Sequence, residues 1–233
     1  MASHGKKRHT KRIAAPKVIS IPRKKHIWIK STTPGAHPKD NSLPLLVLLR
    51  DLLKICSTAR EAKRLIINGQ VKIDGRQIKD IAFQVGLMDV VTLGGLGSFV
   101  ILNKSGKLLP FKTQHSDSKL CKVTGKHVVK NGKVQLALHD GKTLMVIEGA
   151  KYSPGDTVKI SLEKHAILEH LKLEKGSTCY VFKGRHAGAT GKLVEVKVFS
   201  GITPSNAIIS DENGHEVITL KDYVFVVDKQ FKA

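Results

Sequence analysis

The stretch STAREAKRLIINGQVKIDGRQIK, from Ser57 to Lys79, predicts a short helix that runs into a tight β-hairpin. Thr58 stands before the predicted helix and Glu61 three residues later, which is the spacing of a reciprocal capping box. Asn68-Gly69 supplies the residue types that end a helix in a left-handed conformation. Beyond it, apolar residues alternate with polar ones, and Asp74-Gly75 is the strongest two-residue hairpin signal.

The predicted helix has one apolar side and one cationic side. At roughly 100° per residue, Ala62, Leu65 and Ile66 fall on the apolar side. The cations of this segment stand on the other side of the helix and along the hairpin, namely Arg60, Lys63, Arg64, Lys72, Arg76 and Lys79. Such a surface can follow a phosphate backbone; the alternative is a solvated helix face beside an ordinary hairpin.

A leucine-rich helix is predicted upstream, behind Pro44, a residue suited to the first helical turn. The residues that repeat there at helical spacing are Leu45, Leu48, Leu49, Leu52 and Leu53. With the NGQVKIDGR turn and the strand VGLMDVVTL, this order resembles the alpha-L RNA-binding fold of small-subunit ribosomal protein four, some pseudouridine synthases and some tyrosyl-tRNA synthetases. The resemblance implies that structured RNA binds at Arg60, Lys63, Arg64, Lys72 and Arg76.

The chain as a whole is strongly basic. Its 233 residues include 40 Lys and Arg against 19 Asp and Glu, a formal net charge of +21. A chain this cationic repels itself unless a polyanion neutralises it, so nucleic acid is expected as the partner ahead of an anionic membrane surface. The aromatic content of 5% favours phosphate and shape recognition of folded RNA over stacking on single strands.

Length, apolar runs and cysteines set further bounds. The chain is long enough for two or three small domains. The longest apolar run, LPLLVLLRDLLKI, is too short to span a bilayer, and the basic start lacks the apolar region of a secretory signal, so an intracellular protein is expected. Cys56, Cys121 and Cys179 lie far apart without metal-binding spacing, which predicts buried, reduced thiols.

The first 40 residues form a basic arm. Between Met1 and Lys39 the sequence holds eleven Lys or Arg and no acid, and four prolines favour an extended path. Because the segment lacks the apolar periodicity of an independent fold, we expect an arm ordered by a partner and threaded along RNA helices. The alternatives are a disordered solubilising tail or a targeting signal. The candidate contacts, with Trp28 as a stacking residue, are Lys6, Lys7, Arg8, Lys11, Arg12, Lys17, Arg23, Lys24, Lys25, Trp28 and Lys30.

From Phe99 to Leu173 the sequence predicts a small β-rich domain. Short alternating runs are interrupted by Ser-Gly, Asn-Gly and Asp-Gly turn signals. The run VVKNGKVQLALHDGKTLMVI is typical of two successive two-residue hairpins and therefore of a meander.

The segment KGSTCYVFKGRHAGATGKLVEV, Lys175 to Val196, predicts two strands joined by a basic turn. It resembles the KOW motif, a β unit of SH3-like barrels in ribosomal proteins and transcription elongation factors, although Ser177 stands where the family often has aspartate. The resemblance implies that Lys183, Arg185 and His186 contact RNA or protein; the alternative is that the glycines only serve tight turns. The near-neutral strands that follow are expected to complete the barrel and to face solvent or protein.

No catalytic constellation is recognised. His165, Glu169 and His170 come nearest to a cluster, but their spacing favours a surface or capping role over metal binding. The nucleotide-binding signatures of synthetases and the catalytic aspartate context of pseudouridine synthases are absent from the sequence. The sequence therefore predicts no enzyme, no cofactor and no metal.

The order of these parts, with the KKRHTKRIAAPK start and the KIDGR hairpin, is similar to that of the e-type small-subunit ribosomal protein four family of archaea and eukaryotes. The resemblance spans nearly the whole chain, and the lack of a further basic tail favours an archaeal member. It implies an α+β multidomain fold with a basic extended N-terminal arm (1–40), an alpha-L two-helix and hairpin module (41–95), a β-rich central domain (96–173) and an SH3-like KOW β-barrel (174–233).

The same resemblance implies a structural constituent of the small ribosomal subunit in the cytoplasm. Its expected partners are small-subunit rRNA and neighbouring ribosomal proteins, with no membrane and no small-molecule substrate. The alternatives are a transient accessory factor of transcription or translation that carries a KOW unit, or an RNA-modifying enzyme.

Overall fold

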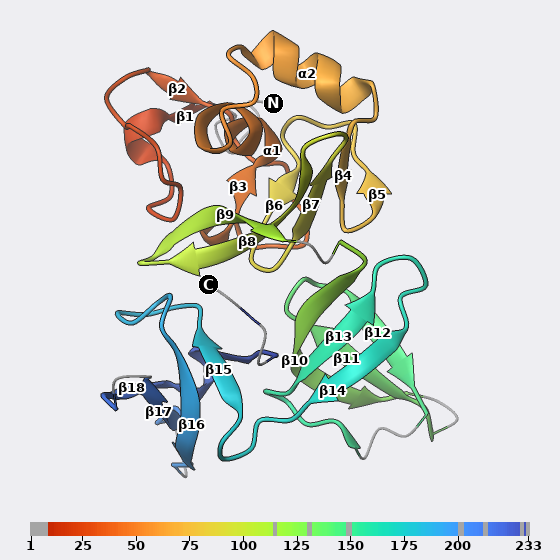
Figure 1. The fold of residues 1–233 in the computed structure, drawn as a ribbon, viewed down its shortest axis with the longest axis vertical. Helices are drawn as coiled ribbons and strands as arrows, with labels where there is room; N and C mark the ends of the chain where they lie inside the picture. The colour runs from red at the N-terminus through yellow and green to blue at the C-terminus, as the bar shows by residue number, and fades with distance from the viewer. Residues whose placement is uncertain are drawn as a thin grey trace, which may run out of the picture.

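The computed structural model describes residues 9–113, 116–129, 132–147, 151–199, 203–211, 214–228 and 231. The described chain is rich in β-structure and is arranged in two tiers (Figure 1). The upper tier contains the arm, the short helices and one five-stranded sheet; the lower tier contains two further five-stranded sheets side by side. No helix among these residues is long and apolar enough to cross a membrane.

The arm folds back on itself and packs on the upper tier. Strand β1 (Thr10–Lys11) pairs antiparallel with β2 (Trp28–Ile29), and the 3-10 turn η1 (Arg12–Ala14) follows β1. The arm residues buried in the main core are Ala15, Val18, Ile19 and Ile29. The expectation of an arm ordered only by a partner is therefore wrong for residues 9–40, because these apolar side chains supply intramolecular packing despite their irregular spacing.

The leucine-rich segment begins as the predicted α-helix and then continues as a wider, π-helical turn. After the 3-10 turn η2 (Lys39–Asn41), strand β3 (Leu43–Pro44) pairs with β6 (Gln84–Val85). Helix α1 (Leu45–Val47) continues into a π-helical turn, η3 (Leu48–Leu52), in which the backbone N–H of Leu53 donates to the carbonyl of Leu48 at 2.9 Å. The side chains from Leu45 to Leu49 are all buried, so core packing maintains this segment through its change of helical pitch.

Helix α2 (Ala59–Ile67) has the predicted capping box. The backbone N–H of Glu61 donates to Thr58 Oγ1 at 3.2 Å, and the Thr58 N–H donates to Glu61 Oε2 at 3.3 Å. The backbone N–H groups of Ser57 and Thr58 both donate to Glu61 Oε2, and they lower the pKa of the Glu61 carboxyl because they favour its ionised form. Ala62 and Ile66 are buried, which confirms the predicted apolar side.

The hairpin that follows joins β4 (Val71–Ile73) to β5 (Arg76–Gln77). Asp74 and Gly75 adopt φ of 48° and 77°, the conformation that a two-residue primed turn requires. The upper sheet has the order β5-β4-β7-β8-β9, and its remaining strands are β7 (Val90–Leu93), β8 (Gly97–Lys104) and β9 (Lys107–Thr113). The boundary predicted between residues 95 and 96 therefore cuts this sheet, because β8 pairs with β7.

The central sheet has the order β12-β11-β10-β13-β14. Its first three strands along the chain form the predicted meander, and the fourth then pairs on the other side of β10. Its strands are β10 (Ser118–Val128), β11 (Val134–Leu138), β12 (Thr143–Val146), β13 (Thr157–Ser161) and β14 (Ile167–Leu171). The turn between β11 and β12 is one residue longer than predicted, because the Leu138 N–H donates to the carbonyl of Lys142. The Asn131-Gly132 turn falls partly outside the described residues.

The C-terminal sheet has the order β18-β17-β16-β15-β19. Its strands are β15 (Thr178–Val181), β16 (Thr190–Lys197), β17 (Asn206–Asp211), β18 (Glu216–Leu220) and β19 (Val224–Val226), with the 3-10 turn η6 (Lys221–Tyr223) before the last. The three cysteines are free and buried in three separate parts of the fold, as their spacing predicted.

Candidate nucleic-acid interface

Helix α2 and its hairpin present one cationic surface, which we call the helix-hairpin face. It consists of the six predicted residues of this module, all exposed, namely Arg60, Lys63, Arg64, Lys72, Arg76 and Lys79. Arg76 also reaches the lower tier, where its Nη2 lies 3.3 Å from His165 Nε2. The capping box and the primed turn fix the backbone that carries these exposed cations.

Beneath the hairpin lies a buried cluster of charges centred on Lys119, a residue of β10 that is 2% exposed. Its ammonium donates to Asp74 at 2.7 Å, to Asp89 at 2.6 Å and to Asp140 at 3.1 Å. Lys142 adds a second bond to Asp74 at 2.9 Å. Asp74 belongs to the hairpin turn, so the central sheet fixes that turn from below.

Opposite charges in this cluster hold each other ionised despite burial. The neighbouring carboxylates raise the pKa of Lys119 and overcome the desolvation that would lower it. In the same way the Lys119 ammonium keeps the pKa of Asp89 far below its usual range and lowers that of Asp140 to about 2. His37 brings the arm into the cluster, since its Nε2 lies 3.0 Å from Asp89. Arm, upper sheet and central sheet thus share one ionic node.

A second buried lysine ties the central sheet to the C-terminal sheet. The Lys122 ammonium donates to the carbonyls of Asp222 at 2.9 Å and Val224 at 2.8 Å, and lies 3.4 Å from that of Lys221. Burial lowers the pKa of Lys122 to about 8, so the group stays protonated at neutral pH. The Tyr180 hydroxyl, which donates to the carbonyl of Asn103, joins the C-terminal sheet to the upper tier.

The arm divides its cations between solvent and the interior. Among the predicted arm contacts that the structure describes, the exposed ones are Lys11, Lys17, Lys24, Lys25, Trp28 and Lys30. Arg12 is 1% exposed, with Nε donating to the carbonyl of Pro22 at 2.8 Å and Nη2 contacting Asp51 at 3.3 Å. The prediction that Arg12 contacts RNA is therefore wrong, because its guanidinium is enclosed by the protein.

Arg23 is half-buried and also serves the arm's own fold. Its guanidinium donates to the carbonyls of Ala15 at 2.6 Å and Pro16 at 3.0 Å. These bonds leave little of the group for another partner. The predicted contacts Lys6, Lys7 and Arg8 lie outside the described residues.

The turn after β15 has the basic character predicted for it, and we call residues 183–188 the basic loop. Lys183, Arg185 and His186 are exposed. The Lys183 ammonium lies 5.3 Å from the centre of the Tyr223 ring, a distance typical of a cation–π contact. Gly184 adopts φ of +91°, a conformation that favours glycine, so this turn depends on its glycine as well as on its charges.

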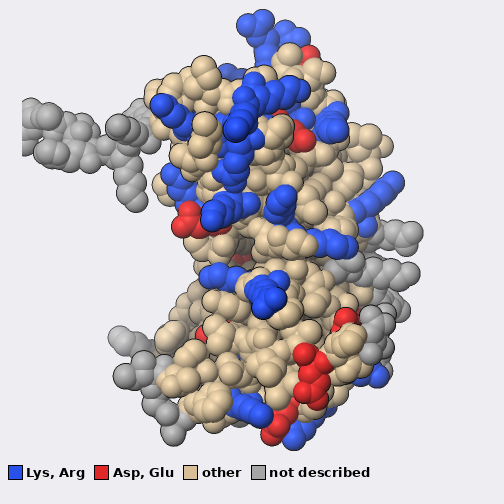
Figure 2. Space-filling model, turned by 90° about the vertical axis from the view of Figure 1, so that its left-hand side faces the viewer, with Lys and Arg blue, Asp and Glu red and all other residues tan. Residues whose placement is uncertain are grey.

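The turn between β8 and β9 carries two exposed lysines that the sequence analysis missed. Lys104 and Lys107 flank Ser105-Gly106 and are direct partners across the hairpin. The signal was a Lys-Ser-Gly-Lys turn, but its place beside the arm and the basic loop depends on strand pairing that the local sequence does not encode. Figure 2 faces the side that carries the arm and shows Lys and Arg over its upper half and middle, with the largest group of acidic residues in the lower half.

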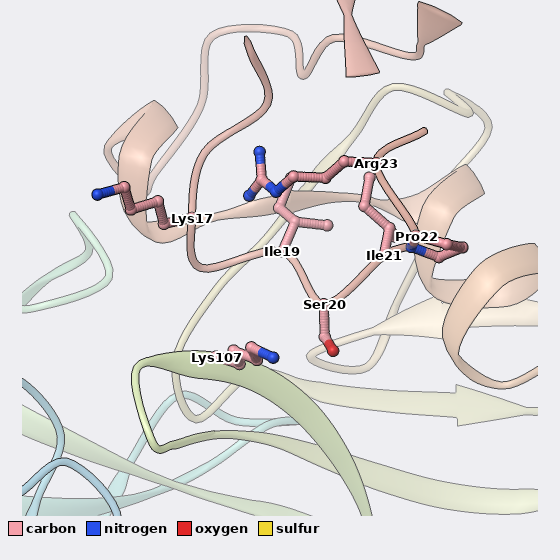
Figure 3. A pocket seen from close by; sticks show the side chains of 7 residues that line it. All are labelled: Lys17, Ile19, Ser20, Ile21, Pro22, Arg23 and Lys107. Carbon is pink, nitrogen blue, oxygen red and sulfur yellow. The ribbon is translucent and has the colours of Figure 1, made fainter. Parts of the chain in front are cut away.

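A pocket of about 210 Å³ lies between the arm and this turn (Figure 3). Its lining residues are Lys17, Ile19, Ser20, Ile21, Pro22, Arg23 and Lys107. The Ser20 hydroxyl and the Lys107 ammonium point toward each other, whereas Lys17 projects away along the surface. The pocket combines an apolar floor with polar donors, a lining suited to part of an anionic ligand.

Cys121, His139 and Asp140 approach one another closely enough to suggest a metal site. Both ring nitrogens of His139 are engaged, however: Nδ1 faces the Lys122 N–H at 3.2 Å and Nε2 faces the carbonyl of Leu87 at 3.2 Å. Burial raises the pKa of the Cys121 thiol far above its ordinary value, and Asp140 already binds Lys119. The group is therefore better explained as part of the ionic node than as a metal centre.

Proteins of known family match this chain over almost its full length. It is 41% identical over 236 residues to "Small ribosomal subunit protein eS4" of Methanocaldococcus jannaschii, covering 97% of this chain and 96% of the relative. The protein of the same name from Methanothermobacter thermautotrophicus is 38% identical, covering 98% and 96%. The crystal structure of the 30S ribosomal protein S4e from Thermoplasma acidophilum is 30% identical with a TM-score of 0.71, and the match covers 82% of this chain and 97% of that one.

The fold and its cationic surface define a basic, β-rich protein with an S4 domain, since the model of that domain matches residues 43–91. The model described as ribosomal family S4e matches residues 99–167, and the RS4NT (NUC023) domain model matches residues 4–40. The chain belongs to ribosomal family S4e.

Proposed function

We propose that this chain is a structural constituent of the small ribosomal subunit that binds and organises small-subunit rRNA and contributes to subunit assembly and translation. The observation that carries the proposal is the match, over nearly the whole chain, to relatives named small ribosomal subunit protein eS4. Its partners are the rRNA and neighbouring ribosomal proteins, its location is the cytoplasmic ribosome, and it performs no catalysis.

The finer architecture belongs to the same proposal. The segment 41–95 acts as an alpha-L-type module, and the C-terminal strands act as a KOW-type, SH3-like barrel. Support comes from the helix-hairpin face on the first unit and from the exposed basic loop on the second.

Binding proceeds through phosphate neutralisation on a surface of fixed shape. Each contacted phosphate releases counterions, so the logarithm of affinity falls linearly with the logarithm of salt concentration. With roughly ten phosphates contacted, the slope is about −9 on duplex-type arithmetic. The Lys119 node preorganises the hairpin turn, so little conformational entropy is lost when the hairpin meets RNA.

The helix-hairpin face is tested by the triple variant R60A/K63A/R64A. All three side chains are exposed, so folding is expected to be unchanged while the salt slope becomes shallower by about three. Binding of the full chain to a small-subunit rRNA transcript is measured across salt concentrations, with urea unfolding as the control. An unaltered slope in the variant would remove this face from the interface.

Membership of the subunit is tested on native particles. After a stringent high-salt wash, the number of copies of the chain per small subunit is counted by quantitative mass spectrometry. About one copy is expected for an integral constituent. A clearly lower number, with the chain recovered in the wash, would contradict the proposal in favour of a transient accessory factor.

A further inference from the structure

The β8–β9 turn lies where three basic segments meet, and its own charges are arranged unfavourably. Ser105 and Gly106 form its tip with φ of 52° and 75°, and Lys104 and Lys107 are Cα partners directly across the hairpin. Like charges placed opposite each other destabilise a strand pair. Within the described residues neither lysine forms an ion pair with a carboxylate. The two ammonium groups are therefore available to an anion from outside the chain.

On one side the turn contacts the basic loop. The Ser105 N–H donates to the carbonyl of Ala187 at 2.9 Å. Gly188 has φ of +101°, and a Cβ at this position would lie 3.2 Å from the Cα of Lys104. The glycine thus permits a close approach of the two backbones, so the basic loop lies directly against the turn at Lys104 and Ser105.

On the other side the turn contacts the arm. The Leu108 N–H donates to the carbonyl of Val18 at 2.8 Å, and Ile19 bridges to Leu108 in parallel. The pocket in Figure 3 lies at this contact, with Lys107 from the turn and Lys17 and Ser20 from the arm. The turn therefore connects the arm and the basic loop into one surface, which we call the seam.

The charge of the seam indicates which class of partner it would bind. The segments that build it, residues 16–25, 102–109 and 183–192, contain no Asp or Glu. Exposed cations occur in all three, namely Lys17, Lys24, Lys25, Lys104, Lys107, Lys183, Arg185 and Lys192. A row of single cations drawn from separate segments matches the regular charge of a nucleic-acid backbone better than it matches an acidic peptide.

We infer that the β8–β9 turn is a phosphate-binding contact that joins the arm and the basic loop into one continuous RNA-binding surface. The inference rests on the rRNA-binding role proposed above and extends it to Lys104 and Lys107. One RNA segment crosses the turn, with a backbone phosphate at the pocket beside Lys107 and the neighbouring phosphates at the basic loop.

The test compares K104Q/K107Q with the matched control K133Q/K164Q, which removes two exposed lysines from the connections between strands of the central sheet. Full-length proteins bind a small-subunit rRNA transcript over a range of salt concentrations, with R60A/K63A/R64A as a reference. We expect the slope of K104Q/K107Q to become shallower by about two and that of the control to stay at the wild-type value. Urea unfolding checks that both variants remain folded.

Whether one RNA segment contacts both the turn and the basic loop is measured by tethered cleavage. The native cysteines are buried, so Lys107→Cys and Arg185→Cys each provide a single accessible thiol for an iron chelate that cleaves nearby RNA. Overlapping or adjacent cleavage positions are expected. Cleavage in RNA segments that are remote from each other in the folded subunit would overturn the single surface.

The outcomes separate the two proposals. Wild-type protein that binds the transcript no better than tRNA would overturn the proposed function and the inference together. Tight wild-type binding, with a reduced slope for R60A/K63A/R64A and an unaltered slope for K104Q/K107Q, would overturn the inference alone. If in addition wild type binds polyglutamate and K104Q/K107Q does not, the seam belongs to an acidic protein segment.

Discussion

Replacing Lys119 by methionine should destabilise the whole chain, because three buried carboxylates lose their shared counter-ion. Methionine keeps most of the volume of the side chain, so packing changes little and the charge is the main variable. Removing one partner of a buried ion pair costs about 3–5 kcal/mol. Typical domains unfold with about 5–15 kcal/mol, so K119M should lose a large part of its stability.

The assay is urea unfolding at pH 7, followed both by far-UV circular dichroism and by the fluorescence of the single tryptophan, Trp28. Trp28 lies in the arm and circular dichroism reports mainly on the sheets, so the two probes show whether the tiers unfold together. The matched control is K164M at an exposed site, which should change the unfolding free energy by less than about 0.5 kcal/mol.

Two further measurements tie the loss to charge. Neutralising the nearest carboxylate in K119M/D89N should cost less than the sum of the single variants, because it removes an unpaired charge. Lowering the pH should also reduce the difference in unfolding free energy between K119M and wild type. The lowered pKa values of Asp89 and Asp140 stabilise wild type above the ordinary aspartate pKa of 3.8, and this stabilisation is lost as the pH falls. A K119M stability within 0.5 kcal/mol of wild type at pH 7, at about the precision of such data, would refute the reasoning.

Three other predictions follow from single contacts. Thr58→Ala removes the acceptor for the Glu61 N–H and should cost about 1 kcal/mol in urea unfolding, whereas Thr58→Ser should recover most of it. Gly191→Ala should weaken the β16–β17 pairing by roughly 1–3 kcal/mol or more, since a Cβ would lie 2.3 Å from the carbonyl oxygen of Ser210. Gly106→Ala is the control, because Gly106 has a φ of +75° but no atom within 4 Å of its Cβ, so this variant has backbone strain without a clash. Burial lowers the pKa of His139 from 6.5 to about 4, so between these pH values the unfolded chain takes up a proton that the folded chain does not. The unfolding free energy should fall by about 3 kcal/mol over that range, and His139→Gln should flatten the fall; an equal pH dependence in the variant would contradict it.

Features set by neighbouring residues could be predicted from the sequence. The capping box depends on Thr58 and Glu61, three positions apart, and the hairpin turn depends on Asp74-Gly75. Both signals act through local backbone geometry, which tertiary contacts did not override. The burial of the cysteines followed in the same way from residue type and the lack of any ligand spacing.

Features set by pairing between distant segments could not be predicted. The tip of the β8–β9 hairpin meets the basic loop because the Ser105 N–H donates to the carbonyl of Ala187, about eighty positions away. The wrong boundary at residues 95 and 96 is a different error, since β7 and β8 are consecutive strands joined by a short turn. The arm is packed because Val18 and Ile19 meet Leu108, a residue about ninety positions away. No periodicity in a short, irregular segment indicates such a contact, so extended structure was the natural expectation.

Contacts between distant segments also decide which cations are buried, and this is why net charge is a poor guide to the number of phosphate contacts. Lys104 and Lys119 are chemically identical, yet the first is exposed at a turn and the second is enclosed by three carboxylates. Arg12 and Lys122 are likewise buried: Arg12 binds the carbonyl of Pro22 and the carboxylate of Asp51, and Lys122 binds carbonyl oxygens. Cations such as these stabilise the packing between parts of the fold and cannot release counterions from RNA. The salt dependence of binding should therefore follow the exposed cations of the helix-hairpin face and the seam, and it should fall well short of the value that a net charge of +21 would suggest.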